Sequence, residues 1–220
     1  FMIETDYHVG RILKLLDEEK LAANTLVIFT SDNGPETTWK KRAEMYSHQS
    51  NAQFREGKRS IYEGGHRVPF FIRWPARIKP GSRLDSPVCQ TDLLATLAEM
   101  LGKKLPNSAG EDSNSFYAEM LNPEKPEKRP PIIHHSSQGR FAIREGKWKL
   151  VMPGAKKSMK AQLYDMEKDP RETTDLAGRH TDTVAALTAR ITKIIKSGRS
   201  SPGQPVKNDT PLWNDLVWMK

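Results

Sequence analysis

Asp32, Asn33 and Gly34 follow a short apolar run of the chain, and their residue types could bind a metal ion. The run, residues 25–30, is rich in β-forming residues and predicts a strand. In open α/β sheets ligands bind at the carboxyl ends of strands, so a site is expected here. Asp32 offers a carboxylate and Asn33 a side-chain carbonyl, and such hard oxygen donors suit Ca²⁺ or Mg²⁺ better than Zn²⁺. The alternative for this segment taken alone is a plain Asx turn, because Asp, Asn and Gly are the commonest turn residues.

Lys58 belongs to a second segment that combines charged residues with two consecutive glycines. A lysine is a compact cation that could bind a tetrahedral anion, although a single lysine in a loop is more often only solvated. Gly64 and Gly65 would let the backbone turn sharply or approach another group closely. Glu63 and Arg67 could form an ion pair around that turn. The segment therefore has the residue types of an anion-binding site, with a solvated loop as the alternative.

The pattern of apolar residues predicts the elements that must position these side chains. Between residues 3 and 20 the apolar residues recur at a helical period, which predicts an amphipathic helix. The run at residues 25–30 is continuously apolar, which is typical of a strand buried on both faces of a parallel sheet. Residues 33–57 are polar without a sustained period and predict a long loop, a kind of segment that is usually functional or disordered.

Regular structure is predicted again beyond this loop. Residues 67–74 predict a further strand. Residues 91–101 predict a helix that Thr91 or Asp92 caps and that Gly102 ends.

The C-terminal part of the chain predicts a small antiparallel arrangement. A stretch rich in Pro, Asn, Glu and Lys, residues 103–131, is typical of a surface linker. Short strands are predicted after it, at residues 141–144, 148–152 and 162–165. A Glu-Gly pair between the first two is a tight-turn signal, so these two should form a hairpin.

One more helix is predicted near the end, from residue 181 to about residue 196, with its apolar residues facing inward. The tail from residue 198 is rich in Gly, Ser and Pro. Trp213 and Trp218 nevertheless predict that the end of this tail docks on the core.

Composition limits the partners that can be expected. The chain has 35 Lys and Arg against 27 Asp and Glu, for a formal net charge of +8. This excess can attract anions, but the basic residues are not clustered with aromatic ones, so nucleic acid is not an expected partner. No apolar run approaches the roughly 20 residues that a membrane span needs. The single cysteine, Cys89, has no base nearby in the sequence and is interpreted as a structural thiol.

Taken together and in order, the motifs resemble the formylglycine-dependent sulfatase family, of the arylsulfatase type. The segments that carry the resemblance are Thr30-Ser31-Asp32-Asn33-Gly34-Pro35-Glu36-Thr37, Gly57-Lys58, Tyr62-Glu63-Gly64-Gly65-His66-Arg67-Val68-Pro69, Arg73-Trp74-Pro75, Asp92-Leu93-Leu94-Ala95-Thr96-Leu97, Ile143-Arg144-Glu145-Gly146-Lys147-Trp148-Lys149, Leu163-Tyr164-Asp165 and Asp169-Pro170-Arg171-Glu172. Each motif alone is weak, and the ordered series from about residue 3 to residue 195 carries the likeness.

The resemblance implies an α/β fold. It is the C-terminal part of an alkaline-phosphatase-like α/β sandwich, plus a small antiparallel-sheet domain with a packed C-terminal helix. On this basis residues 1–130 are expected to be the C-terminal part of the catalytic domain, residues 131–197 the small domain and residues 198–220 a tail.

The resemblance also implies a chemistry, the hydrolysis of a sulfate monoester by a formylglycine made from a Cys or a Ser. A divalent cation, Ca²⁺ or alternatively Mg²⁺, orients the nucleophile and neutralises sulfate charge in such enzymes. Asp32 and Asn33 match two of the metal ligands. Lys58 matches the lysine that contacts the sulfate and stabilises the leaving oxygen.

Other parts of that family's site have no match in these residues. They are the nucleophile motif (a Cys or Ser with Pro and Arg close behind), the paired aspartates, an arginine and a lysine, and two histidines. They are expected upstream of Phe1, and the chain alone is expected to be inactive. The histidines of this chain match none of the catalytic positions; they are His8, His48, His66, His134, His135 and His180. His48 could approach a substrate from its polar loop, while His134 and His135 have weak spacing support as metal ligands.

Two other functions stay open. A phosphoesterase or phosphonate hydrolase of the same superfamily would typically have Asp-His where this chain has Asp32 and Asn33, because imidazole binds Zn²⁺ or Mn²⁺. A non-catalytic sulfatase-like binding module is the other alternative. The substrate expected from the resemblance is a sulfated small molecule or carbohydrate, and the expected location is periplasmic, secreted or lysosomal. The sequence does not indicate an oligomeric state.

Overall fold

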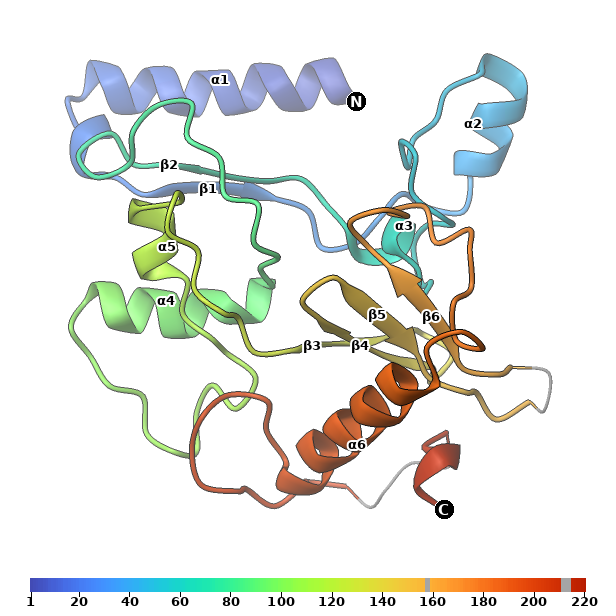
Figure 1. The fold of residues 1–220 in the computed structure, drawn as a ribbon. Helices are drawn as coiled ribbons and strands as arrows, with labels where there is room; N and C mark the ends of the chain where they lie inside the picture. Colours follow the sequence, from blue (N-terminus) through green and yellow to red (C-terminus); the bar gives the residue numbers. More distant parts are fainter. Residues whose placement is uncertain (157–158, 211–214) are drawn as a thin grey trace. The chain divides into compact units, whose positions relative to one another are not determined.

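The computed structural model describes residues 1–156, 159–210 and 215–220 (Figure 1). These residues form two compact units. The first contains Phe1–Ser31, Pro69–Asp85 and Ala118–Pro126, and the second contains Asp32–Val68, Ser86–Tyr117 and Glu127–Lys220. None of the described helices is long and apolar enough to cross a membrane.

The first unit combines one long helix with a two-stranded sheet. Its elements are α1 (Met2–Glu18), η1 (Ala22–Asn24), β1 (Val27–Thr30), β2 (Phe70–Arg73) and most of α5 (Tyr117–Leu121). The predicted N-terminal helix is confirmed as α1, whose half-buried residues Val9, Leu13 and Leu16 lie on one helical face. An ion pair of 3.1 Å between Asp17 and Arg73 joins the end of α1 to β2.

The predicted parallel pairing of the first strand is wrong. β1 pairs with β2, the second predicted strand, in antiparallel register, with Val27 opposite Arg73. The apolar run suggested burial on both faces, but Phe29 is 38% exposed and Phe71, opposite it, is 64% exposed. Their ring centroids lie 6.2 Å apart, so the run supplies a cross-strand aromatic pair rather than a strand covered on both sides.

The second unit is built around a four-stranded antiparallel sheet. Its strands, in spatial order, are β3 (Ile132–His135), β4 (Phe141–Glu145), β5 (Trp148–Val151) and β6 (Gln162–Asp165). The predicted hairpin is confirmed as β4 and β5, and Gly146 in its turn has a φ of +56°, which glycine adopts without steric cost. β3 was not predicted, because it directly follows the Pro-rich stretch that predicts a surface linker.

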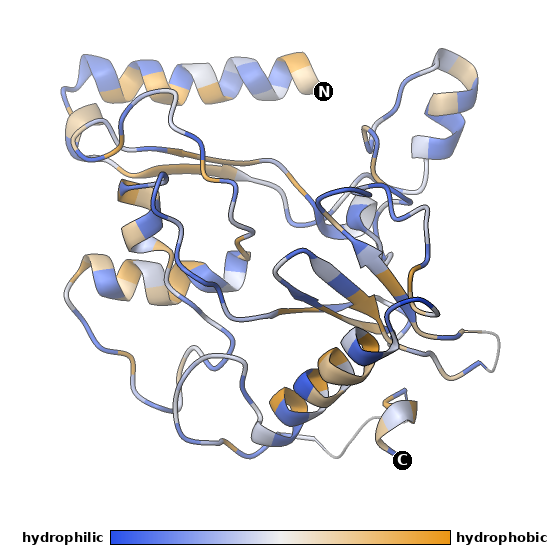
Figure 2. Ribbon diagram, viewed as in Figure 1, coloured by the Kyte–Doolittle hydropathy of each residue, from blue (hydrophilic) through white to orange (hydrophobic). Residues whose placement is uncertain are grey.

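α6 (Thr181–Ser197) confirms the predicted C-terminal helix and packs against this sheet (Figure 1). Hydrophobic and hydrophilic residues alternate along it at helical spacing (Figure 2). Leu187 and Ile191 of α6 share one buried cluster with Ile143, Leu150 and Leu163 of the strands. This cluster is the main hydrophobic core of the second unit.

The remaining elements of the second unit are shorter. They are α2 (Trp39–Tyr46), α3 (Glu63–His66), η2 (Gln90–Asp92), α4 (Leu93–Met100) and η3 (Val217–Met219). α2 lies within residues 33–57, which were predicted to be a loop throughout; it is eight residues long and contains the run Lys40-Lys41-Arg42, so its sequence shows no apolar period.

Asp92 organises the approach to α4, the helix predicted at residues 91–101. It occupies the N-cap position of α4 but makes no side-chain cap bond there, contrary to the expectation. Its fully buried carboxylate instead accepts the Cys89 N–H (2.7 Å) and the Asn114 N–H (3.0 Å) and pairs with Arg129 (2.5 Å). One side chain thus joins three segments of the chain.

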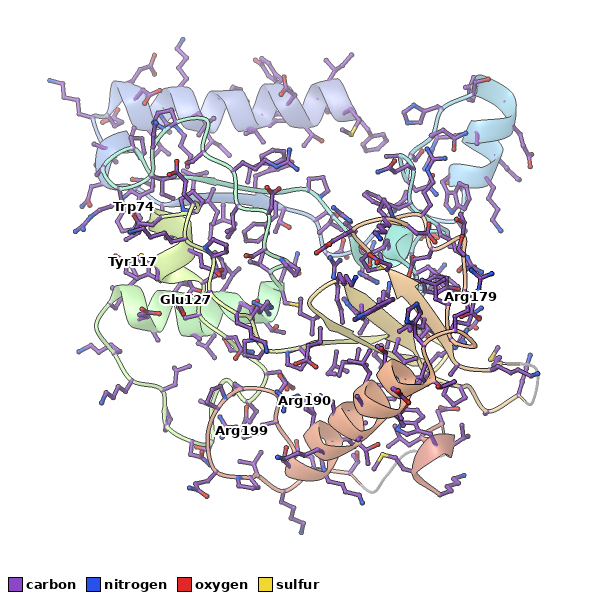
Figure 3. The ribbon with its side chains drawn as sticks, viewed as in Figure 1. Trp74, Tyr117, Glu127, Arg179, Arg190 and Arg199 are labelled. Carbon is purple, nitrogen blue, oxygen red and sulfur yellow. The ribbon has the colours of Figure 1, made fainter. Side chains whose placement is uncertain are left out.

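Several contacts attach the C-terminal segment to the rest of the unit, among them those of Trp218 and Arg199. Trp218 Nε1 donates to Thr192 Oγ1 over 3.2 Å, so the predicted docking of the tail is confirmed for this residue. Trp213 lies outside the described residues. Arg199, labelled in Figure 3, donates to the side chain and the carbonyl of Asn107 at 2.7 and 3.0 Å. The loop after α6 is therefore fixed to the loop after α4.

Candidate functional site

The Asp32-Asn33-Gly34 turn follows β1 along the chain, and its polar side chains are ordered by short local bonds. The Asp32 carboxylate accepts the N–H of the next residue, Asn33, at 2.9 Å. Asn33 Nδ2 donates to the Gly34 carbonyl at 3.0 Å, which fixes the plane of its amide. Asp32 is exposed and Asn33 half-buried. This hydrogen bond and a metal-binding role are compatible, because a carboxylate that accepts one hydrogen bond keeps other lone pairs for a cation.

The glycine-containing segment docks directly on this turn. The Gly34 N–H donates to the Gly65 carbonyl at 3.0 Å, and the Lys58 N–H donates to the Pro35 carbonyl at 2.9 Å. A Cβ on Gly34 would lie 1.8 Å from the Gly64 oxygen, so no side chain fits there. On Gly64 it would lie 2.2 Å from the Glu56 oxygen. The predicted close backbone approach at the paired glycines is confirmed.

Lys58 is brought to the same place as Asp32 and Asn33 by these backbone bonds. Its Nζ lies 3.3 Å from Glu36 Oε2, and Arg59 lies 3.1 Å from the other oxygen of the same carboxylate. A hydrogen bond from the Thr37 N–H, followed by the bond from Lys58, lowers the pKa of Glu36 to about 2. Glu36 therefore stays ionised and aims the lysine. The sequence alone gives Glu36 no role, although this residue lies within residues 30–37, a segment that carries the resemblance.

The backbone beside Lys58 is unusual as well. Glu56 and Arg59 have positive φ angles of 59° and 76°, a region that residues other than glycine rarely adopt. Such strained conformations persist where surrounding structure enforces them, and they are common at binding and catalytic sites.

A buried group of charges, here termed the Lys149 cluster, lies behind the glycine segment and consists of Lys149, Glu63, Glu172 and His66. Lys149 Nζ is 2.9 Å from Glu63 Oε1, 2.7 Å from Glu172 Oε1 and 3.1 Å from His66 Nε2. The side chain of Lys149 is fully buried. The predicted ion pair between Glu63 and Arg67 is present at 3.4 Å, but it is only the outer edge of this cluster.

The protonation of the cluster follows from burial and its central cation. Burial alone would raise the pKa of Glu63, but the charged groups around it, Lys149 first among them, together outweigh burial and lower that pKa to about 2. Burial raises the pKa of Glu172 more than Lys149 lowers it. Burial and the nearby Lys149 lower the pKa of His66 to about 4, so the imidazole is neutral at physiological pH.

The other histidines and the cysteine have structural surroundings. The rings of His66 and His134 stack at 4.0 Å, and His135 stacks on Phe141 at 4.3 Å. Across the described residues, no group of three or more His, Cys, Asp or Glu side chains is arranged to hold a metal ion. Burial, and then the Asp92 carboxylate, raise the pKa of Cys89 to about 11, which does not suit a nucleophile.

A cavity of about 510 Å³ lies in the second unit and is lined by Gln53, Arg55, Arg171, Glu172 and Thr173. Arg55 is held in its wall by bonds to the Tyr164 hydroxyl (3.1 Å) and the Glu172 carbonyl (3.0 Å). Arg171 is exposed. Two guanidinium groups give the cavity a positive character that suits an anionic ligand.

The donor set of the turn fits Ca²⁺ or Mg²⁺, because a carboxylate and an amide carbonyl are the hard oxygen ligands that these ions prefer. Next to this turn along the backbone bond from Lys58 to Pro35, the ammonium of Lys58 is paired with Glu36, and a lysine is a cation that can bind an oxyanion. This arrangement is typical of hydrolases that use a divalent cation on an anionic ester.

Comparison with known proteins agrees with this class. Two protein families match the chain: "Sulfatase" over residues 1–103 and "N-sulphoglucosamine sulphohydrolase, C-terminal" over residues 54–197. The chain is 31% identical over 209 residues to an N-acetylgalactosamine-6-O-sulfatase of Bacteroides thetaiotaomicron, covering 88% of this chain and 40% of that protein. It is 32% identical over 218 residues to arylsulfatase A of Homo sapiens, covering 89% and 41%.

A solved structure from Bacteroides thetaiotaomicron, described with the metabolism of multiple glycosaminoglycans, is similar with a TM-score of 0.77 and 32% identity. The match covers 86% of this chain and 42% of that one. The chain belongs to the sulfatase family. The predicted fold class, part of an alkaline-phosphatase-like sandwich with a small antiparallel sheet and a C-terminal helix, is confirmed. The chain spans about two fifths of the length of the curated relatives named here, 40% and 41%.

Proposed function

We propose that the protein containing this chain hydrolyses a sulfate monoester, and that Asp32, Asn33 and Lys58 belong to its active site. The observation that carries the proposal is the pair of backbone bonds that joins the two segments, Gly34 to Gly65 and Lys58 to Pro35. Through these bonds, residues far apart in the sequence present two oxygen donors and a cation together.

Asp32 and Asn33 would hold a Ca²⁺ ion, or Mg²⁺, through their side-chain oxygens. When bound, the cation supplies Lewis-acid charge to the sulfate oxygens and orients the nucleophile. The nucleophile would be a formylglycine from a part of the protein outside this chain, since the motif that yields it has no match here. On the same family basis, residues 1–130 would belong to the catalytic domain and residues 131–197 to the small domain, with residues 198–220 as a tail.

Lys58 would act on the leaving group. Negative charge develops on the bridging oxygen as the S–O bond breaks, and a fixed ammonium that hydrogen-bonds this oxygen stabilises the transition state. Glu36 keeps the lysine in place and remains ionised, because its pKa is about 2. The hydrogen bond from the Lys58 N–H to the Pro35 carbonyl restrains the backbone of Lys58, and so fixes the point from which its side chain extends.

We propose a sulfated carbohydrate or small molecule as the substrate, and a secreted, periplasmic or lysosomal location. The named relatives support a carbohydrate, since one is an N-acetylgalactosamine-6-O-sulfatase and another is described with glycosaminoglycan metabolism. The positive cavity at Arg55 and Arg171 could accept a further anionic group of such a substrate. Asn33 favours a sulfatase over a phosphonate hydrolase, because an amide is a poor ligand for Zn²⁺.

Lys58→Ala tests the proposal in the full-length protein. We expect kcat to fall about 10²-fold or more, the size typical of removing a group that stabilises developing charge. The thermal unfolding midpoint should stay the same, since Lys58 is a third exposed (34%). Lys40→Ala, an exposed lysine on α2, is the matched control and should keep full activity. A Lys58→Ala variant with normal kcat and lower thermal stability would make Lys58 a structural residue.

A further inference from the structure

The Lys149 cluster joins three parts of the second unit that are distant in sequence. Glu63 and His66 belong to α3, Lys149 to β5 of the sheet, and Glu172 to the loop after β6. Besides binding Lys149, Glu172 accepts the Glu63 N–H through Oε2 at 2.6 Å. A carboxylate from the sheet side therefore holds both the cation and the first residue of α3.

Burying this cluster is not an economical way to stabilise a fold. Removing a lysine and two carboxylates from water is costly, and apolar residues of similar volume often serve stability equally well. A buried group of paired charges does define the position of each member. If one member shifts, its partner is left as an unpaired buried charge. The cluster is thus better suited to fixing where α3 lies.

α3 is in direct contact with the proposed metal-binding turn. Gly64 and Gly65 follow Glu63 immediately, and the Gly65 carbonyl accepts the Gly34 N–H at 3.0 Å. The Gly64 oxygen is so close to Gly34 that even a methyl group there is excluded. The path from Lys149 to Asn33 therefore runs through Glu63, the two glycines and Gly34, with a hydrogen bond or a chain link at every step.

We propose that Lys149 and Glu172 are positioning residues for the metal site. By fixing Glu63, they hold the Gly64-Gly65 backbone against the turn, and so set the geometry in which Asp32 and Asn33 bind Ca²⁺. This inference rests on the proposed function, because it assumes that the turn is the metal site.

Lys149→Met in the full-length, metal-free protein tests the inference, with CaCl₂ titrated by isothermal calorimetry. Met keeps the length of the side chain and removes the charge. We expect the Ca²⁺ dissociation constant to rise about 10- to 100-fold, the usual effect of losing a group that supports metal ligands. Excess Ca²⁺ should restore much of the activity, because the ligands themselves are intact.

Two further variants keep the test decisive. Lys147→Met is the matched control, since Lys147 lies two residues away on the same hairpin, is 40% exposed and pairs only with Asp165 among the ion pairs described. It should leave Ca²⁺ affinity unchanged. Glu172→Gln is the variant to use if Lys149→Met does not fold. Its amide oxygen can still accept the Glu63 N–H while the charge is lost, and we expect a smaller rise in the dissociation constant.

The outcomes separate the inference from the proposed function. If Asp32→Ala abolishes Ca²⁺ binding while Lys149→Met, or Glu172→Gln in its place, leaves the dissociation constant unchanged and lowers only the unfolding temperature, the Lys149 cluster is merely structural. If Asp32→Ala itself leaves Ca²⁺ affinity intact, the metal site is misplaced, and the positioning role is refuted with it.

Discussion

Lys58 and Glu36 show how the fold can hold a loop lysine in one place. A lysine on a loop has four rotatable bonds and a strongly hydrated charge, so it does not hold one position by itself. Here the Lys58 N–H is bonded to Pro35, and Nζ lies 3.3 Å from a carboxylate that stays ionised. The positive φ angles of Glu56 and Arg59 place the lysine on a constrained stretch of backbone.

The sequence could indicate Asp32, Asn33 and Lys58 as candidate site residues because each lies in a local motif. Lys149 and Glu172 also lie in motifs that carry the resemblance, but the sequence could not assign them a role, because the role proposed for them depends on contacts with Glu63 across 86 and 109 residues of chain. Lys149 looks like an ordinary strand lysine next to a tight turn. Only the fold shows that its side chain points into the interior.

At the residue scale, His66 gives the protein a defined dependence on pH. The pKa of His66 is lowered to about 4 in the folded chain, against about 6.5 in the unfolded one. Between pH 4 and pH 6.5, His66 therefore binds a proton in the unfolded state but not in the folded state. The contribution of neutral His66 to the stability of the folded chain is therefore complete above pH 6.5. It is lost as the pH falls from 6.5 to 4.

His66→Gln should make the unfolding temperature less sensitive to pH within this window. The change in unfolding free energy between pH 6.5 and pH 4 should shrink by on the order of 2–3 kcal/mol, since one pKa unit corresponds to about 1.4 kcal/mol. Calorimetric unfolding curves of both proteins across the window would measure it. His8→Gln, on the exposed surface of α1, is the control and should reproduce the unmodified profile. Equal slopes for all three proteins would exclude His66 as the group responsible.

At the scale of elements, the sequence predicted best where one residue pattern decides the structure. α1, the β4–β5 hairpin and α6 each show a helical period or a turn signal strong enough to identify them. α2 and β3 were missed, because α2 contains the run Lys40-Lys41-Arg42 without an apolar period, and β3 directly follows the Pro-rich stretch that was predicted to be a linker. The direction of β1 was wrong because an apolar run indicates a strand without specifying its partner.

The packing of α6 on the sheet leads to a prediction at this scale. Ile191 is fully buried within the cluster that joins the helix to β4, β5 and β6. Ile191→Ala should lower the free energy of unfolding by about 2–5 kcal/mol, the usual cost of a large cavity in a core. Urea unfolding monitored by circular dichroism would measure this. Lys193→Ala, on the exposed side of the same helix, should change stability very little. If Ile191→Ala lowered the free energy of unfolding no more than Lys193→Ala does, α6 would not be tightly packed on the sheet.

At the scale of the whole molecule, the proposed site would need groups that these residues only partly supply. The described side chains include two oxygen ligands and one cation of the proposed site, but the nucleophile motif has no match anywhere in the sequence. We therefore expect the proposed sulfate-ester hydrolysis to require the full-length protein.

The isolated chain should have no turnover on aryl sulfates. We expect p-nitrophenyl sulfate to be released at the background rate under conditions where the full-length protein is active. A denatured sample of the same chain is the control for contamination. Saturable hydrolysis by the isolated chain would show that it contains its own nucleophile, contrary to the proposal.

The environment of Cys89 has a practical consequence. With a pKa of about 11, the thiol carries a thiolate fraction roughly a hundredfold or more below that of an ordinary cysteine at neutral pH. The N–H of the same residue is bonded to the buried Asp92 carboxylate, which also joins residues 114 and 129. An alkylating reagent would thus modify this half-buried cysteine slowly at neutral pH. Cys89 is the only cysteine of the chain. Its labelling rate is therefore a single-site measure of this environment.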